Sequence, residues 1–120
     1  MSRLRLRTLA LCDQTVVSTW GDIDLSTAPL LRAHLSALTA GGGARLVLNL
    51  SHTDYLDSTG LAVLTHIHKT LRVGGGELSV IRCRPPVARI LHLVGFHHLF
   101  TIGERPPRPA RPAAPITAQG

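Results

Sequence analysis

The nearly continuous apolar run Leu-Val-Leu-Asn-Leu at 46–50 constrains the fold of this 120-residue chain more than any other feature. Such a run is typical of a strand buried on both faces, and sheets of this kind consist of parallel strands covered by helices. Apolar residues recur at helical spacing on both sides of the run, over 27–40 and from Ser58 onward. Each helical stretch ends at a triglycine, at 41–43 and at 74–76. This helix–strand–helix pattern predicts an α/β fold.

Shorter segments complete the predicted architecture. Two β-rich stretches near the start, joined by a turn at 12–14, favour an antiparallel hairpin, whereas strands separated by helices are expected to run parallel. We therefore predict a single mixed sheet of about five strands with helices packed on it, in the order β-β-α-β-α-β-α-β. The expected segments are strands at 4–11 and 14–20, a helix at 27–40 with the apolar stripe Leu30, Leu31, His34, Leu35 and Leu38, a strand at 46–50, a helix from Ser58, a strand at 78–81, a helix from Pro85 to Gly95, and a strand at 99–102.

The positive charge is concentrated at the two ends of the chain. There are 13 Lys and Arg against 7 Asp and Glu, which gives a formal net charge of +6. Arg3, Arg5 and Arg7 supply three of these units, and 103–120 supplies two, from three Arg and one Glu. Five of the eight prolines also fall in 103–120, so that segment cannot sustain a helix or a central strand. We expect a folded domain at 1–102 and a disordered, Pro- and Arg-rich tail at 103–120.

The sequence predicts no catalytic, metal or cofactor site. The seven histidines show neither a HExxH spacing nor a neighbouring CxxC pair. The turn at 57–60 lies between a strand and a helix, as the serine of a hydrolase does, but it lacks the GxSxG pattern. The triglycines follow helices, and no GKS or GKT comes after them, so they are turns rather than phosphate-binding loops. These features favour a protein that is not an enzyme.

Composition also bears on location and partners. Cys12 and Cys83 form no disulfide framework, which favours a reduced, cytoplasmic setting. The chain contains no run of about 18 apolar residues, so no membrane partner is expected. The basic ends raise nucleic acid as a partner. With one Trp, one Tyr and two Phe, however, the chain has few aromatic residues on which bases could stack, and this argues against nucleic acid.

The segment Asp-Ser-Thr-Gly-Leu at 57–61 follows the buried strand and begins the second predicted helix. On residue chemistry alone, Ser58 is foremost a candidate helix N-cap. Asp24, at the exit of the second strand, is likewise a candidate helix-entry residue. Asp24, Asp54 and Asp57 could form a carboxylate cluster, although each also fits an ordinary turn.

This segment belongs to a wider, ordered set of motifs. The other pieces are Gly-Asp-Ile-Asp at 21–24, a strand that ends Leu-Asn-Leu at 48–50, a Gly-Gly turn before the strand at Leu78, Pro-Val at 86–87 and Val-Gly-Phe at 94–96. Taken together, the set spans about residues 4–102. In order and spacing it resembles the STAS domain family, and specifically the bacterial anti-sigma factor antagonists.

The resemblance implies a phosphorylation switch at Ser58. In that family, the first hydroxyl residue after the signature Asp is phosphorylated by an anti-sigma factor that is itself a serine kinase and holds the ATP and Mg²⁺. The unphosphorylated antagonist binds this kinase and frees the sigma factor, which regulates transcription, and the phosphorylated form cannot bind. The resemblance further implies that Asp24, Asp57, Thr59 and Gly60 contribute to partner recognition.

Two alternatives stay open at this point. A STAS domain can serve as an interaction module of another signalling complex, such as a stressosome, without being phosphorylated. The basic ends leave a nucleotide- or nucleic-acid-binding protein as the other alternative. The chain also departs from the family at its end, where the Pro- and Arg-rich segment from Gly103 stands in place of the usual last helix.

Overall fold

The computed structural model describes residues 4–40, 44–96 and 101–103. Its elements are β1 (Arg5–Ala10), β2 (Thr15–Trp20), α1 (Ala28–Thr39), β3 (Arg45–His52), α2 (Ser58–Val73), β4 (Glu77–Ile81), α3 (Pro85–Leu93) and β5 (Thr101–Gly103). The predicted order of strands and helices is therefore confirmed. Part of the strand predicted at 99–102 lies outside the described residues, and so does the predicted tail, except that Gly103 belongs to β5.

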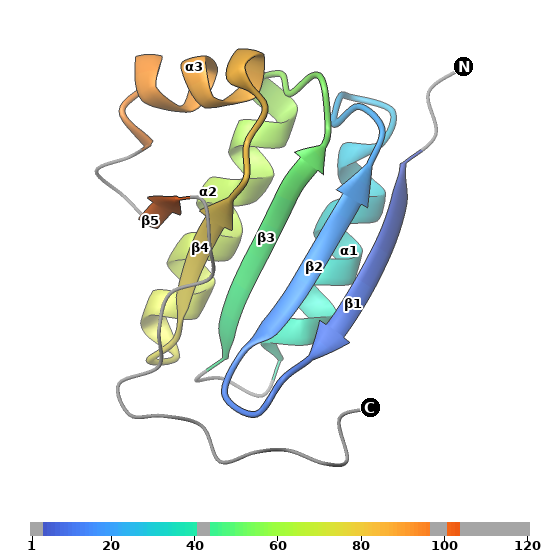
Figure 1. Cartoon of the computed structure of the whole chain (residues 1–120). Coiled ribbons are helices and arrows are strands. Elements are labelled where there is room, and N and C mark those ends of the chain that lie inside the picture. The colour runs from blue at the N-terminus through green and yellow to red at the C-terminus, as the bar shows by residue number, and fades with distance from the viewer. Residues whose placement is uncertain (1–3, 41–43, 97–100, 104–120) are drawn as a thin grey trace.

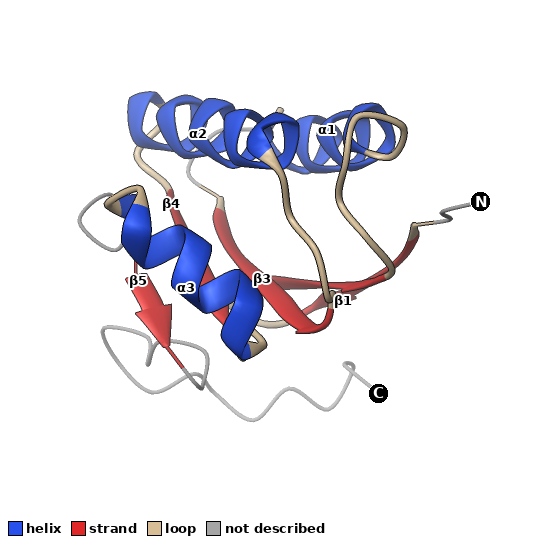
Figure 2. Cartoon of the chain, turned by 90° about the horizontal axis from the view of Figure 1, so that it is seen from above, coloured by secondary structure: helices blue, strands red, loops and turns tan. Residues whose placement is uncertain are grey.

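The five strands form one sheet in the order β1-β2-β3-β4-β5. β1 pairs antiparallel with β2, and the other neighbours are parallel. Figure 1 shows α1 and α2 behind this sheet, and Figure 2 shows the same two helices side by side as a separate layer, with α3 near β4 and β5. The prediction of a single mixed sheet with helices packed on it is confirmed. Within the described ranges, none of the helices is long and apolar enough to span a membrane.

One apolar core lies between the sheet and the two-helix layer. Alternate residues of the central strands point into it, among them Val17, Leu48 and Val80, each at most 1 % exposed. Leu35 of α1 and Ile67 of α2 meet them from the helix layer and are equally buried. Packing against this core fixes where both helices begin, and their first turns carry the site described below.

The apolar pattern predicts β3 correctly and α1 only in part. Leu46, Val47 and Leu48 are consecutive and each 1 % exposed, so β3 is buried on both faces, as expected. In α1, the prediction that Leu30 lies on the buried stripe is wrong, because Leu30 is 51 % exposed while Leu31 is fully buried. Adjacent residues of an α-helix differ by about 100° in direction, so only one of two neighbouring leucines can face the sheet.

Candidate functional site

Two loops meet at the carboxyl edge of the sheet, where β2 leads into α1 and β3 leads into α2. Ile23 in the first loop forms an isolated parallel bridge with Leu56 in the second. The backbone N–H and C=O of Ile23 both bond to the second loop, at 3.0 and 3.2 Å. Both bridging side chains are buried, at 0 and 1 % exposure. The segments 21–27 and 53–57, which we call the paired loops, are therefore held together as one unit.

Asp57 caps the amino end of α2. Its Oδ1 accepts hydrogen bonds from the N–H groups of Thr59 at 2.9 Å and Gly60 at 3.2 Å, and the Thr59 hydroxyl donates to the same oxygen. The carboxylate thus satisfies donors that the helix leaves unpaired and lies at the positive end of the helix dipole. The prediction that Ser58 is the N-cap is wrong. The bridge at Leu56 keeps Asp57 extended, and Ser58 is the first residue of the helix.

Ser58 is exposed on the first turn of α2. Within the described part of the chain, its hydroxyl has no hydrogen-bonding partner, because the capping bonds all go to Asp57. The oxygen is therefore open to a group from another molecule. The expectation that it is phosphorylated stays a prediction.

Asp24 lies in the first of the paired loops and is held by the residues that lead into α1. Its Oδ1 accepts hydrogen bonds from the Ser26 hydroxyl at 2.7 Å, the Ser26 N–H at 3.0 Å and the Thr27 N–H at 3.2 Å. The Ser26 hydroxyl is the largest of the influences on the pKa of Asp24, which is lowered. The pKa of Asp57 is lowered as well, chiefly by the Thr59 hydroxyl, and the nearby charge of Asp24 partly opposes this effect. The structure thus brings two ionised carboxylates together.

Gly60 is the point of closest approach between α2 and the paired loops. It is buried, and a Cβ placed there would lie 2.4 Å from Leu56 Cδ1 and 2.8 Å from Ile23 Cγ2. A side chain at this position would force the first turn of α2 away from the loops or displace both residues. Gly60 therefore supports the site through packing and is not part of its exposed surface.

Sequence reasoning missed Leu25 and Tyr55. They are 75 % and 50 % exposed, and they line a surface hollow together with Asp24, Ser26 and Asp57. Large exposed apolar side chains gathered beside polar groups are typical of surfaces that bind another molecule. The sequence offered one weak indication of their role, because each is an apolar or aromatic residue inside an otherwise polar loop.

Asp54 does not join the other two carboxylates. It forms an ion pair with Arg84 at 2.7 Å, and Arg84 Nε also donates to the Ser51 carbonyl at 3.1 Å. This contact ties the second loop to the residue that precedes α3. The cluster of Asp24, Asp54 and Asp57 considered from the sequence is therefore reduced to a pair. Among the residues that the structure describes, no group of three or more His, Cys, Asp or Glu could hold a metal ion.

Comparison with known proteins identifies the family. The family model described as the STAS domain matches residues 6–106, so this chain belongs to the STAS domain family. It is 35 % identical over 82 residues to BtrV of Bordetella bronchiseptica, covering 68 % of this chain and 71 % of BtrV. It is 30 % identical over 88 residues to the anti-sigma F factor antagonist of Paenibacillus polymyxa, covering 72 % and 75 % of the two chains.

A solved structure agrees with these relatives. The crystal structure of an anti-sigma factor antagonist from Mycobacterium paratuberculosis matches with a TM-score of 0.77 and 30 % identity, over 86 % of this chain and 87 % of that one. The resemblance to the STAS family and its anti-sigma factor antagonists, inferred above from the motifs, is thereby confirmed.

Proposed function

We propose that this chain is an anti-sigma factor antagonist that is switched off by phosphorylation of Ser58. The unphosphorylated chain would bind an anti-sigma factor of the serine-kinase type and so release a sigma factor. The kinase would hold the ATP and Mg²⁺. The observation that carries the proposal is the exposed Ser58 hydroxyl, which is not used for capping and lies next to the Asp57 cap. Relatives named as anti-sigma factor antagonists support the same function.

The paired loops supply the recognition surface in this proposal. Asp24 and Asp57 provide negative charge, and Leu25 and Tyr55 provide exposed apolar area beside it. Protein interfaces draw most of their affinity from a few apolar or aromatic residues, whereas charged groups add specificity and speed of encounter. We therefore expect the partner to present basic and apolar groups to the paired loops.

A phosphate on Ser58 would gain the weak effect of the helix dipole but few direct hydrogen bonds from the end of α2. The N–H groups of Thr59 and Gly60 are already bonded to the Asp57 carboxylate, and the Leu61 N–H donates to the Asp57 carbonyl. Phosphorylation adds about −1.5 to −2 units of charge. That charge would therefore face the partner's surface, which already complements two carboxylates. A 100-fold loss of affinity would require a penalty of about 2.8 kcal/mol.

Phosphosite mapping tests the chemical step. The anti-sigma factors of the source organism are purified and incubated with the chain, ATP and Mg²⁺, and the phosphorylated residue is mapped by mass spectrometry. We expect phosphate on Ser58 alone, with no incorporation in Ser58→Ala and full incorporation in Ser36→Ala, a matched change in α1 away from the paired loops. A kinase that binds the chain but leaves Ser58 unmodified would contradict the switch.

Binding measurements test the electrostatic step. We expect Ser58→Asp to weaken binding of the same anti-sigma factor by about 100-fold, and Ser58→Ala to bind like the wild type. Thr70→Asp is the control, because it adds the same charge about 18 Å along α2 and should change affinity little. Equal binding by Ser58→Asp and Ser58→Ala would contradict the proposed role of charge.

A STAS interaction module that is not phosphorylated is the second candidate. It is favoured by the capping network of Asp57, Thr59 and Gly60, which is complete without a phosphate and gives a static docking surface. A partner that binds through the paired loops and tolerates Ser58→Asp would support this second function over the first.

A further inference from the structure

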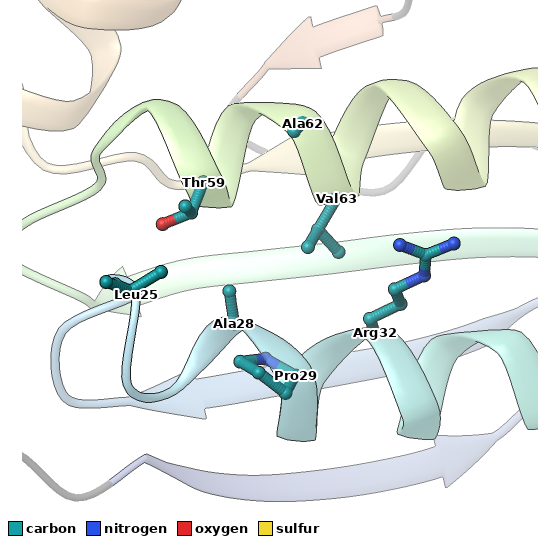
Figure 3. Close-up of a pocket in the computed structure, with 7 residues that line it drawn as sticks. All are labelled: Leu25, Ala28, Pro29, Arg32, Thr59, Ala62 and Val63. Atoms are coloured by element: carbon teal, nitrogen blue, oxygen red, sulfur yellow. The ribbon is translucent and has the colours of Figure 1, made fainter.

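A groove runs between α1 and α2 next to Ser58. Its volume is about 330 Å³, and small or apolar side chains form its walls: Ala28, Pro29, Ala62 and Val63. In Figure 3, Val63 points from α2 towards α1, and Ala28 points from α1 towards α2. The volume is at the lower end of the roughly 300–1,000 Å³ found for ligand pockets, so it suits one or two side chains better than a large cofactor.

The two ends of the groove differ in charge. Arg32 lines one end, and its side chain extends from α1 towards α2, beside Val63 (Figure 3). Among the described residues, no carboxylate pairs with Arg32; the three ion pairs involve Arg45 and Arg84. Leu25 lines the other end and also belongs to the hollow that contains Asp24 and Asp57. The groove is therefore a continuation of the paired-loop surface, with acidic groups beyond one end and the Arg32 cation at the other.

We propose that this groove receives an apolar side chain of the anti-sigma factor, in a segment with a fixed orientation. A basic residue of that segment would face Asp24 and Asp57, the apolar residue would fill the groove, and an acidic residue would face Arg32. The inference rests on the proposed function and adds to it the position, chemistry and direction of the bound partner segment.

Three observations favour a partner segment as the occupant. The groove joins the surface on which the Ser58 switch would act, so one partner can cover both. Carboxylates lie beyond its Leu25 end and Arg32 lies at its other end, which selects a segment of opposite polarity. Its walls are built mainly from short side chains, so a protruding apolar residue can enter without rearrangement of either helix.

Filling the groove tests the apolar contact. Ala62→Gln places a longer side chain in the groove from an exposed helical position, and Ala37→Gln makes the same change on the exposed side of α1. We expect Ala62→Gln to weaken binding of the anti-sigma factor at least tenfold and Ala37→Gln to leave it unchanged. Both variants should keep the thermal midpoint of the wild type, which shows that the fold is intact.

Reversing the charge tests the orientation. Arg32→Glu should weaken binding at least tenfold, whereas Lys69→Glu, an equal change of net charge at an exposed position further along α2, should have less than a threefold effect. Other outcomes would contradict the inference. If Ala62→Gln and Arg32→Glu bind with wild-type affinity while Ser58→Asp loses binding, the proposed binding of a partner segment in the groove is wrong and the proposed function stands. If no anti-sigma factor binds the wild type, the groove inference and the proposed function are both wrong. A wild-type dimer in sedimentation experiments that Ala62→Gln dissociates would assign the groove to a second copy and also overturn the inference.

Discussion

Asp57 links the start of α2 to the recognition surface. One of its oxygens accepts three hydrogen bonds from the first turn, while the side chain remains part of the surface hollow that contains Asp24. Because Asp57 makes the capping hydrogen bonds, the Ser58 hydroxyl is not needed to cap the helix. A single carboxylate thus stabilises the helix and leaves the neighbouring hydroxyl accessible.

Substitution of Asp57 should reveal how much its capping hydrogen bonds and its negative charge each contribute to the free energy of unfolding. We expect Asp57→Ala to lower the free energy of unfolding by about 1 kcal/mol near neutral pH. Because the folded-state pKa lies below the unfolded value of about 3.9, the charge stabilises the fold above that pH. The difference between wild type and variant should therefore shrink as the pH falls from about 5 towards 2. Urea unfolding at several pH values measures it.

Asp57→Asn separates the two contributions. Asparagine caps a helix about as well as aspartate but carries no charge, so this variant should retain most of the stability and lose the pH dependence. A stability difference between wild type and Asp57→Ala that stays constant down to acidic pH would show that ionisation of Asp57 does not contribute.

At the scale of the elements, the contact between α2 and the paired loops depends on Gly60. A Gly→Ala change inside a helix ordinarily stabilises by up to about 1 kcal/mol. Here the added Cβ would collide with Leu56 and Ile23, and overpacking of this kind typically costs about 1–3 kcal/mol. We expect Gly60→Ala to destabilise the fold by about 1 kcal/mol in urea unfolding and to weaken partner binding, because the first turn of α2 moves.

A second background tests whether the collision is the cause. A Leu56→Ala chain lacks the closer of the two collisions and keeps the approach to Ile23 Cγ2, so the penalty of Gly60→Ala should be smaller there than in the wild type. A penalty of the same size in both backgrounds would show that the close approach to Leu56 is not what requires glycine.

The elements themselves were largely predictable from apolar periodicity. The run at 46–50 and the helical stretches beside it identified β3, α1 and α2, and the alternation of helices and strands implied the parallel part of the sheet. The prediction failed where two adjacent residues were equally suited to a role. Leu30 and Leu31 differ only in which of them faces the sheet, and packing decides this. Ser58 and Asp57 are both good caps, and the bridge at Leu56 decides between them.

The site was predictable only in part, for a related reason. Family motifs pointed to Asp24 and Ser58 because those motifs are local in sequence. The groove between α1 and α2, with Leu25 at one end and Arg32 at the other, depends on how two helices lie side by side. No local sequence pattern specifies how closely α1 and α2 lie to each other, so these features can be seen only in the folded chain.

At the scale of the whole molecule, the proposed switch should operate without refolding. The Ser58 hydroxyl has no bond to lose within the described structure, and a negative charge near a helix amino end costs little or stabilises by about 0.3–1 kcal/mol. We expect Ser58→Asp to keep the far-ultraviolet circular dichroism of the wild type and to shift the thermal midpoint by no more than about 8 °C. Loss of helical signal or of cooperative unfolding would indicate a conformational mechanism instead.

The basic ends of the chain give a second prediction at this scale. If nucleic acid is not a physiological partner, any affinity for DNA or RNA should be weak, fall steeply with salt concentration and diminish when 104–120 is deleted. A filter-binding titration measures this. Tight binding that resists salt and survives the deletion would favour the nucleic-acid alternative.

The bridge between Ile23 and Leu56 restricts how this surface can evolve. Because each paired loop is aligned to the other by backbone bonds on both sides of Ile23, an insertion in one loop would break the register of its neighbour. New partner preferences are therefore expected to arise by exchange of side chains within loops of constant length. The turn at 11–14 lies at the opposite end of the sheet (Figure 1), and within the described residues a side-chain ion pair of Asp13 with Arg45, rather than a backbone bridge, joins it to another segment, so it is the place to attach a fluorescent reporter.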